Sequence, residues 1–379
     1  MEVKTKTRQS NFELMKIVSM LFILIWHFTY NTNLITDTDG FLHFVLLVIW
    51  FVAVIHVNSF IISLGYFQNN KRFKLSRVIA FNNSAWFYKI LFLIVFLILG
   101  TSLTSVDIFK LLSPITLYEQ YWFLSVYIIL YLLSPFLNII IDKISKKQFH
   151  LLLLTLFLLT SIIPTITGQL AYNNSQGHSV FSFVFLYFIG AYLSRYPIDK
   201  NYFFKVTPNN TRKLIFIFLF LFIALFNSLL CHYGEELIDS TSTFLRWIGD
   251  ILVSSRLGFD NPLVIIQTIC YFLFFSSLDI KSKVINKIAS LSFGVYLIHD
   301  NILLRPKLYN AFYDIYYSSS FFAILGRIFV FSTVIFIVCI LIEWLRQIIF
   351  KFFSRRKIAK KLREKLLSFF KSINLNVNW

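Results

Sequence analysis

The chain has 379 residues, of which 57% are hydrophobic and only 14% are charged. A water-soluble protein of this length could not bury so much apolar surface, so the composition excludes an ordinary soluble enzyme and indicates a membrane protein. The net charge of +18 could point to nucleic acid as a partner. Basic loops on the cytoplasmic side of a membrane protein explain it better, so we expect the lipid bilayer, and no nucleic acid, as a partner.

Apolar runs long enough to cross a bilayer as helices recur along the whole chain. No segment alternates like the strand of a barrel, so the predicted fold class is all-α, a polytopic membrane bundle of about ten transmembrane helices. The first run has no small-residue cleavage site, and we expect it to be a span rather than a cleaved signal. The predicted spans are 12–30, 42–66, 80–100, 121–141, 149–166, 179–194, 213–231, 262–278, 286–304 and 320–345.

The placement of basic residues fits this span count. If the N-terminus is cytoplasmic, the loops expected inside hold 28 of the 36 Lys and Arg, and the loops expected outside hold 5. This bias predicts that both termini are cytoplasmic, in a multi-pass protein of the plasma membrane. We expect residues 1–345 to form one transmembrane domain and residues 346–379 to form a basic amphipathic tail on the inner membrane surface. The acidic outer loop, residues 232–261, is either a cover for an opening or a solvated connection.

Cysteine and histidine spacing indicates neither a disulfide framework nor a metal site. The three cysteines lie far apart in apolar runs, and the seven histidines show no HxxH or HxxxH spacing. No metal is therefore predicted.

The first span carries three ionisable residues, Glu13, Lys16 and His27. Lys16 and His27 are eleven residues apart, close to three helical turns, so they share one face about 16 Å apart along the axis. Glu13 lies one turn before Lys16 and could pair with it. Such groups inside a bundle usually line a cavity, so we expect a polar passage along this helix. Alternatively, Glu13 and Lys16 reach water at the inner interface, and His27 is an interfacial residue.

A neutral imidazole at His27 could take a proton from a hydroxyl, because its unperturbed pKa of about 6.5 suits a general base. In the ninth span, Ser292, Tyr296 and His299 share a helical face. His299 falls in the outer half of its span, as His27 does, so the two imidazoles could meet. The remaining histidines are expected to be interfacial or packing residues, and they are His43, His56, His150, His178 and His232.

Four places in the chain match one family of membrane enzymes in order and spacing. They are NFELMKIVSMLFILIWHF (11–28), HVNSFIISLGYF (56–67), YWFLSVYIILYLLSPFLN (121–138), and the pair VFLYFIGAYL (184–193) with SLSFGVYLIHDN (290–301). In these motifs the chain resembles the acyltransferase-3 family of integral-membrane O-acyltransferases, in particular the single-domain members that modify bacterial surface polysaccharides. In that family a basic residue, ten positions and a histidine follow one another in the first span, as Lys16 and His27 do here.

The chain departs from the family pattern at several points. The family usually has Arg where this chain has Lys16, and Lys keeps the charge but loses the planar fork of donors. Leu64 separates Ser63 from Gly65, where the family commonly has Ser directly before Gly. No hydrolase-like domain follows the last span, so we expect the chain to act alone or with a separate partner.

The resemblance implies a donor and an acceptor. The donor would be acyl-coenzyme A, most often acetyl-CoA, as a substrate rather than a permanently bound cofactor. The acceptor would be a sugar hydroxyl on a lipid-linked oligosaccharide or a polysaccharide of the bacterial cell envelope, such as a capsule or exopolysaccharide. His27 would act as base or carry the acyl group as an acyl-histidine. Lys16, with Glu13, would face the donor or the developing oxyanion.

Binding residues follow from the same resemblance. Basic residues of KRFKLSR (71–77), namely Arg72, Lys74 and Arg77, would receive the phosphates of coenzyme A; Lys74 and Arg77 resemble the family's paired basic residues. Alternatively, these charges only set the topology.

Aromatic and polar residues of the fourth and ninth spans could contact the substrates. Tyr121 and Trp122 would offer an apolar face to a sugar ring or acyl arm, or belong to an aromatic belt. Ser292 and Tyr296 are further candidate substrate contacts.

Two other functions are also compatible with the sequence. A polysaccharide polymerase or flippase also has many spans and handles lipid-linked glycans, without acyl transfer. A sensor or scaffold without catalysis is the second alternative.

Overall fold

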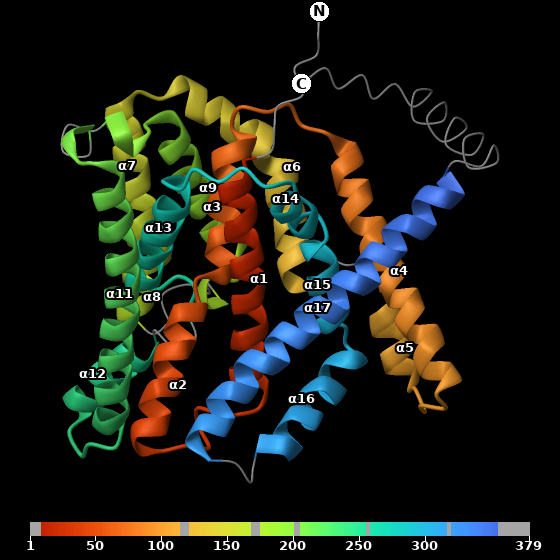
Figure 1. Cartoon of the computed structure of the whole chain (residues 1–379). Coiled ribbons are helices and arrows are strands. Elements are labelled where there is room, and N and C mark those ends of the chain that lie inside the picture. Colours follow the sequence, from red (N-terminus) through yellow and green to blue (C-terminus); the bar gives the residue numbers. More distant parts are fainter. Residues whose placement is uncertain are drawn as a thin grey trace, which may run out of the picture.

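The computed structural model is a bundle of helices, as expected for a polytopic membrane protein (Figure 1). It describes residues 9–113, 121–167, 175–200, 205–254, 258–316 and 320–354, and these ranges contain helices and no strand. Within them, seven helical segments are long and apolar enough to cross a membrane, and α9 and α13 are shorter apolar helices. The predicted all-α class is confirmed.

The helices have the following bounds: α1 (Ser10–Asn31), α2 (Gly40–Ala53), α3 (His56–Gln68), α4 (Leu75–Ile98), α5 (Ser105–Leu112), α6 (Trp122–Lys143), α7 (Lys146–Phe157), α8 (Ile163–Thr167), α9 (Val180–Arg195), α11 (Asn209–Ile238), α12 (Thr243–Ser254), α13 (Pro262–Ser276), α14 (Lys283–Ala289), α15 (Ser292–His299), α16 (Leu304–Tyr316) and α17 (Phe321–Ser354). A five-residue π-helical turn, Leu158–Ile162, joins α7 to α8.

Three predicted spans are divided among separate helical segments, and one of them, residues 149–166, runs through α7, the π-helical turn and α8. Residues 42–66 fall in α2 and α3, which meet at Val54 and Ile55. Residues 286–304 hold the end of α14, all of α15 and the start of α16. Side chains supply hydrogen bonds at these breaks: the Ser290 hydroxyl donates to the Lys287 carbonyl (2.6 Å), and the Asn301 carboxamide oxygen accepts from the Leu303 amide (3.1 Å). Such local bonds compete with a continuous helix.

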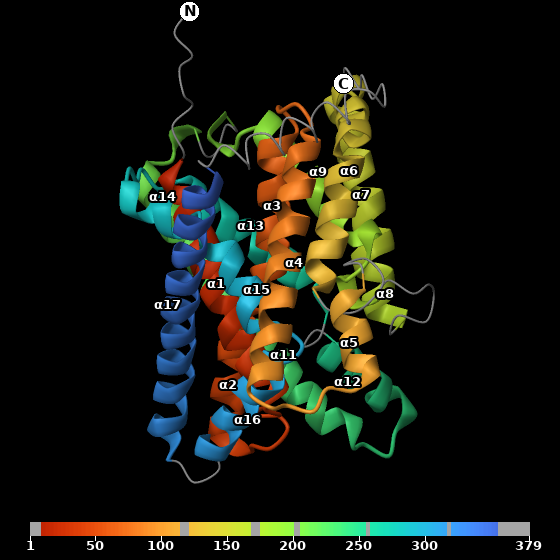
Figure 2. The same ribbon diagram turned by 90° about the vertical axis from the view of Figure 1, so that its right-hand side faces the viewer.

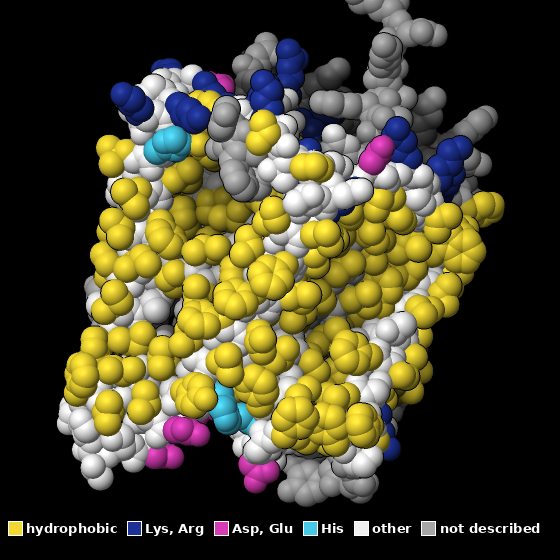
Figure 3. All heavy atoms as spheres, turned by 60° about the vertical axis from the view of Figure 1, so that its left-hand side comes forward, with side chains coloured by type: hydrophobic (Ala, Val, Ile, Leu, Met, Phe, Trp, Pro, Cys, Tyr) yellow, Lys and Arg dark blue, Asp and Glu magenta, His cyan; other side chains and the backbone are white. Residues whose placement is uncertain are grey.

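The two ends of the bundle differ in charge (Figure 3). Most Lys and Arg side chains on this face gather at one end with a few acidic side chains among them, other acidic side chains lie at the opposite end, and an apolar band separates the two ends. The connections from α3 to α4, from α6 to α7 and from α13 to α14 all lie at the end that we call the basic end (Figure 1). This separation fits the alternation on which the predicted topology rests.

Two glycines let α3 and α9 pack at backbone distance, side by side in Figure 2. A Cβ atom on Gly65 would overlap the Tyr187 carbonyl oxygen, and a Cβ atom on Gly190 would overlap the Ile62 carbonyl oxygen. Small residues commonly mark such close helix crossings in membranes. The second sequence motif and the first half of the fourth therefore meet at this crossing.

Helix α1 lies inside the bundle and contacts α2, α3, α13, α15 and α17. A buried polar link fixes its position: the Ser19 hydroxyl lies 2.8 Å from the Ser59 hydroxyl of α3 and 3.1 Å from the Tyr271 hydroxyl of α13. One helix thus reaches most walls of the interior, which suits it to carry functional groups at both ends.

Candidate active site

Two adjoining cavities follow α1 through the bundle. The first, which we call the Lys16 cavity, has a volume of about 670 Å³. The second, the His27 cavity, has a volume of about 440 Å³. Both are lined by the same four side chains at their junction, Ile23, Phe60, Phe123 and Tyr296. The structure therefore places Lys16 and His27 in neighbouring cavities along one helix, as the eleven-residue spacing predicts.

His27 lines the His27 cavity and contacts His299, which is buried. The Nδ1 atom of His27 lies 3.1 Å from Nε2 of His299, and the Nδ1 atom of His299 lies 2.6 Å from the Val295 carbonyl oxygen. A carbonyl only accepts, so His299 carries its hydrogen on Nδ1 and, when neutral, accepts at Nε2. His27 must then donate from Nδ1, which leaves the lone pair on its Nε2. The pair is thus arranged to present one basic nitrogen.

Four further His, Asp and Arg side chains line the His27 cavity, and they are His56, His178, Asp300 and Arg305. The Nδ1 atom of His56 lies 2.8 Å from the Ala53 carbonyl oxygen, which places its lone pair on Nε2. Arg305 pairs with Asp300, also in the lining, at 3.2 Å. The sequence prediction assigned His56 and His178 to packing and did not single out Arg305. Only the deep position of His56 in its span gave a signal.

An aromatic wall closes the His27 cavity. The Trp122 ring stacks on Phe259 with centroids 6.1 Å apart, and it lies 4.3 Å from the His178 ring. Buried donors occur in the same lining: Trp26 Nε1 and the Tyr296 hydroxyl find no hydrogen-bond partner among the described residues. A buried donor without a partner is costly. The lining of the cavity therefore combines aromatic ring faces with two side chains whose buried donors are not used among the described residues.

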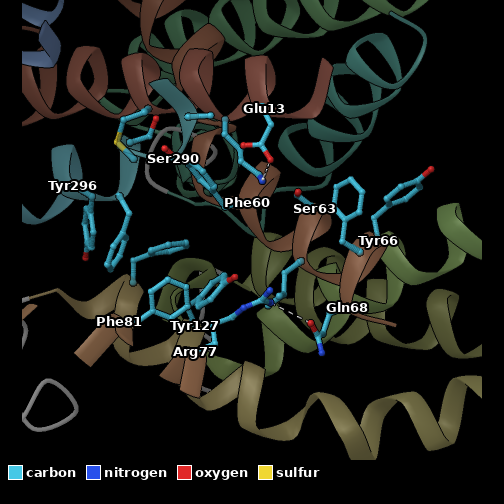
Figure 4. A pocket seen from close by; sticks show the side chains of 18 of the residues that line it. Glu13, Phe60, Ser63, Tyr66, Gln68, Arg77, Phe81, Tyr127, Ser290 and Tyr296 are labelled. Carbon is cyan, nitrogen blue, oxygen red and sulfur yellow. Dashed lines mark hydrogen bonds and ion pairs between the residues drawn. The ribbon is translucent and has the colours of Figure 1, made fainter. Parts of the chain in front are cut away.

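Figure 4 shows the Lys16 cavity, with Glu13 on α1 and Arg77 on α4 in its wall. The Lys16 ammonium lies 3.2 Å from Glu13 Oε1, so the expected ion pair is present. Arg77 donates to Gln68 Oε1 at 3.3 Å, and its guanidinium lies 5.4 Å from the Tyr131 ring centroid. Lys71, which the sequence prediction did not select, also lines this cavity.

The other predicted site residues fall in different places. Ser292 lines the Lys16 cavity and Tyr296 lines both cavities, whereas neither described lining includes Arg72, Lys74 or Tyr121. Arg72 and Lys74 are exposed at the basic end.

Tyr121 is fully buried and holds α15 in place. Its hydroxyl donates to the Leu297 carbonyl at 2.6 Å and accepts from the Asn301 amide at 3.3 Å. Tyr121 thus contacts the end of α15 and Asn301, and it does not belong to the lining of either cavity described above.

Segments outside the membrane-spanning core also differ from simple loops. The acidic segment 232–261 is largely helical, because α11 continues to Ile238 and α12 follows. Helix α17 continues to Ser354, past the expected end of the transmembrane domain, and residues 355–379 of the expected tail lie outside the described residues.

Fold and cavities together define a polytopic membrane protein with two adjoining cavities inside its helical bundle, one of which is lined by histidines. The chain belongs to the acyltransferase-3 family, because the family model described as an acyltransferase domain matches residues 9–345. No curated protein and no solved structure gave a significant match. The family membership makes the protein a membrane acyltransferase and confirms the resemblance drawn from the sequence motifs.

Proposed function

We propose that this acyltransferase moves an acetyl group from acetyl-CoA to a hydroxyl of a cell-surface or lipid-linked polysaccharide, in the plasma membrane. The observation that carries the proposal is the relay from Val295 through His299 to His27, at a cavity that adjoins a second cavity reached from the basic end. A thioester supplied at one end and an alcohol supplied at the other would meet at the junction.

The Lys16 cavity suits the donor. Lys71 and Arg77 line it near the basic end, and their charges favour the phosphates of coenzyme A. Lys16 lies deeper along α1 and is partly neutralised by Glu13. The apolar side chains Ile23 and Phe60 at the junction would accommodate the small methyl group of the acetyl thioester.

The His27 cavity suits the acceptor. Trp122 and Phe259 present ring faces on which the apolar face of a sugar can pack. Trp26 Nε1 and the pair of Asp300 with Arg305 provide donors and an acceptor for sugar hydroxyls. This division gives Trp122 the acceptor role that the sequence suggested and adds Trp26 to it.

The chemical step follows from the tautomer of His27. Nε2 takes the proton of the acceptor hydroxyl while the oxygen forms a bond to the thioester carbonyl carbon. His299 accepts from His27 Nδ1–H and stabilises the imidazolium. The Tyr296 hydroxyl, which has no other partner among the described residues, can donate to the oxyanion. The carbon–sulfur bond then breaks, and the coenzyme A thiolate takes the proton from His27.

The same geometry also serves an acyl-histidine intermediate, in which His27 Nε2 attacks the thioester first. Both routes need the lone pair on Nε2, so they share the requirement for His299. They differ in whether labelled acetyl remains on the protein when the acceptor is withheld.

Comparison of surface glycans from cells with and without this protein tests the proposed function. We expect O-acetyl signals in NMR spectra of the isolated glycans only when the protein is present, with glycan length unchanged. Glycans that become shorter or disappear without the protein, while their acetyl content per sugar is constant, would support a polymerase or flippase instead.

A further inference from the structure

We propose that His43, His232 and Glu235 form a zinc site that joins α2 to α11 at the end of the bundle opposite the basic end. His43 comes from α2, while His232 and Glu235 lie one turn apart on α11. Their candidate ligand atoms all lie within 4.8 Å of one another. Figure 3 shows histidine beside acidic side chains at this end of the molecule.

The three residue types match what zinc binds. Two imidazole nitrogens and one carboxylate oxygen are a known ligand set for zinc, with a fourth position left for water. Two imidazoles also disfavour Mg²⁺ and Ca²⁺, which prefer oxygen ligands. Spacing rules within one helix do not detect such a group, because its members come from two helices.

The orientation of His43 supports the assignment independently. Its Nδ1 atom lies 2.9 Å from the Ile35 carbonyl oxygen, so Nδ1 carries the hydrogen and Nε2 faces Glu235. Histidines that bind metals typically donate their second ring N–H to a carbonyl or carboxylate in this way. The chain has therefore fixed both the tautomer and the direction that a zinc ligand at this position requires.

The contact between His43 and Glu235 holds a proton. The Nε2 atom lies 2.6 Å from Glu235 Oε2, which is a hydrogen-bond distance. A neutral imidazole with its hydrogen on Nδ1 and an ionised carboxylate would face each other with lone pairs only, so a proton lies between the two side chains. Zinc would displace that proton. Zinc binding should then release a proton and weaken as the pH falls.

The distances between the candidate ligand atoms are close to those of a loaded site. Zinc lies about 2.0–2.2 Å from nitrogen or oxygen ligands, so tetrahedral ligand atoms are about 3.4 Å apart. The contact between His43 and Glu235, at 2.6 Å, must open to this spacing, and all candidate ligand atoms already lie within 4.8 Å of one another. The side chains of His43 and Glu235 are 11% and 26% exposed, so an ion can enter from solvent while most of the site stays shielded.

A zinc ion here would stabilise the contact of α2 with α11. Helix α2 leads directly into α3, which carries His56 in the His27 cavity. The ion would thus stabilise the packing of α2 against α11 without taking part in acyl transfer. Its free energy of binding would add to the free energy of unfolding.

Zinc titration of the purified full-length protein tests the site. The protein is purified in detergent with a tag that contains no histidine, and zinc binding is measured in competition with a chromophoric chelator. We expect one zinc per chain, retained in excess Mg²⁺, and a rise in thermal unfolding temperature with zinc. His232→Gln and Glu235→Gln should each weaken binding at least about tenfold and remove the thermal shift.

Two controls separate this site from other histidines. His150→Gln changes a histidine that lies 2.6 Å from the Tyr192 hydroxyl elsewhere in the bundle and should leave zinc binding intact. His27→Ala should also retain the zinc, which distinguishes this site from the proposed acyl-transfer site. Absence of zinc binding by the wild-type protein at micromolar free zinc would overturn the proposal. So would equal affinity in the wild-type, His232→Gln and Glu235→Gln proteins.

Discussion

His27 Nδ1 lies 3.1 Å from His299 Nε2, and this contact joins the first span to α15 across 272 positions of sequence. Because His299 Nδ1 is bound to the Val295 carbonyl, the contact fixes which nitrogen of His27 is basic. His299 therefore acts in the proposed reaction through His27, as a positioning residue.

Replacement of His299 should lower turnover more than donor binding. His299→Ala removes the acceptor for His27 Nδ1–H, and we expect kcat to fall by about 10²–10⁴ with little change in KM for acetyl-CoA. His299→Gln retains an oxygen that can accept, so it should recover part of the activity. A steady-state assay of acetyl transfer in membranes measures both constants. Equal losses in the Ala and Gln variants, through KM alone, would contradict this role.

The role proposed for Lys16 requires a positive charge at this position rather than the particular shape of a lysine side chain. Lys16→Arg keeps the cation beside Glu13 and should retain activity, as the family's usual Arg suggests. Lys16→Ala should lower kcat/KM by about 10–100-fold, the equivalent of one charge-assisted hydrogen bond. The same transfer assay compares the variants at matched protein levels. An Ala variant as active as the Arg variant would remove Lys16 from the mechanism.

The basic residues that follow α3 differ in whether they line the Lys16 cavity. Lys71 and Arg77 line the Lys16 cavity, and the described lining does not include Arg72 or Lys74. The double variant Lys71→Ala with Arg77→Ala should raise KM for acetyl-CoA by about tenfold or more. Arg72→Ala with Lys74→Ala removes the same charge and is the matched control. Similar KM values for the two double variants would indicate that Lys71 and Arg77 do not bind acetyl-CoA and only help to set the topology.

The crossing of α3 and α9 predicts a purely structural effect. Gly190→Val would push a side chain into the Ile62 carbonyl, and we expect a loss of stability of about 1–3 kcal/mol or more. Thermal unfolding in detergent measures the loss. Gly326→Val on α17 is the control, because a Cβ atom there would meet nothing within 4 Å among the described residues. Equal melting temperatures for the two variants would contradict the close crossing.

Helical periodicity predicted the part of the site that lies on one helix. Lys16 and His27 share a face of α1 because eleven residues make nearly three turns, and each lines one of the adjoining cavities. The meeting of His27 with His299 was also expected, since both fall in the outer halves of their spans.

Periodicity could not predict which helices face one another. His56, His178 and Arg305 come from three different segments, and only the assembled bundle brings them to one cavity. Tyr121 is buried against α15 and has a left-handed backbone conformation (φ 60°) before α6, and hydrophobicity reports neither feature. Hydrophobicity likewise does not reveal the break between α14 and α15, because the apolar run of the sequence continues across it.

Transfer of labelled acetyl from acetyl-CoA to endogenous glycan, measured in membranes that contain either the wild-type protein or His27→Ala, tests whether the His27 imidazole is the base. We predict that His27→Ala abolishes labelling while the variant is present at the wild-type level and still binds acetyl-CoA. His150→Gln, measured in parallel, should label normally. Labelling by His27→Ala at the wild-type rate would show that the His27 imidazole is not the base, and the proposed mechanism would be wrong.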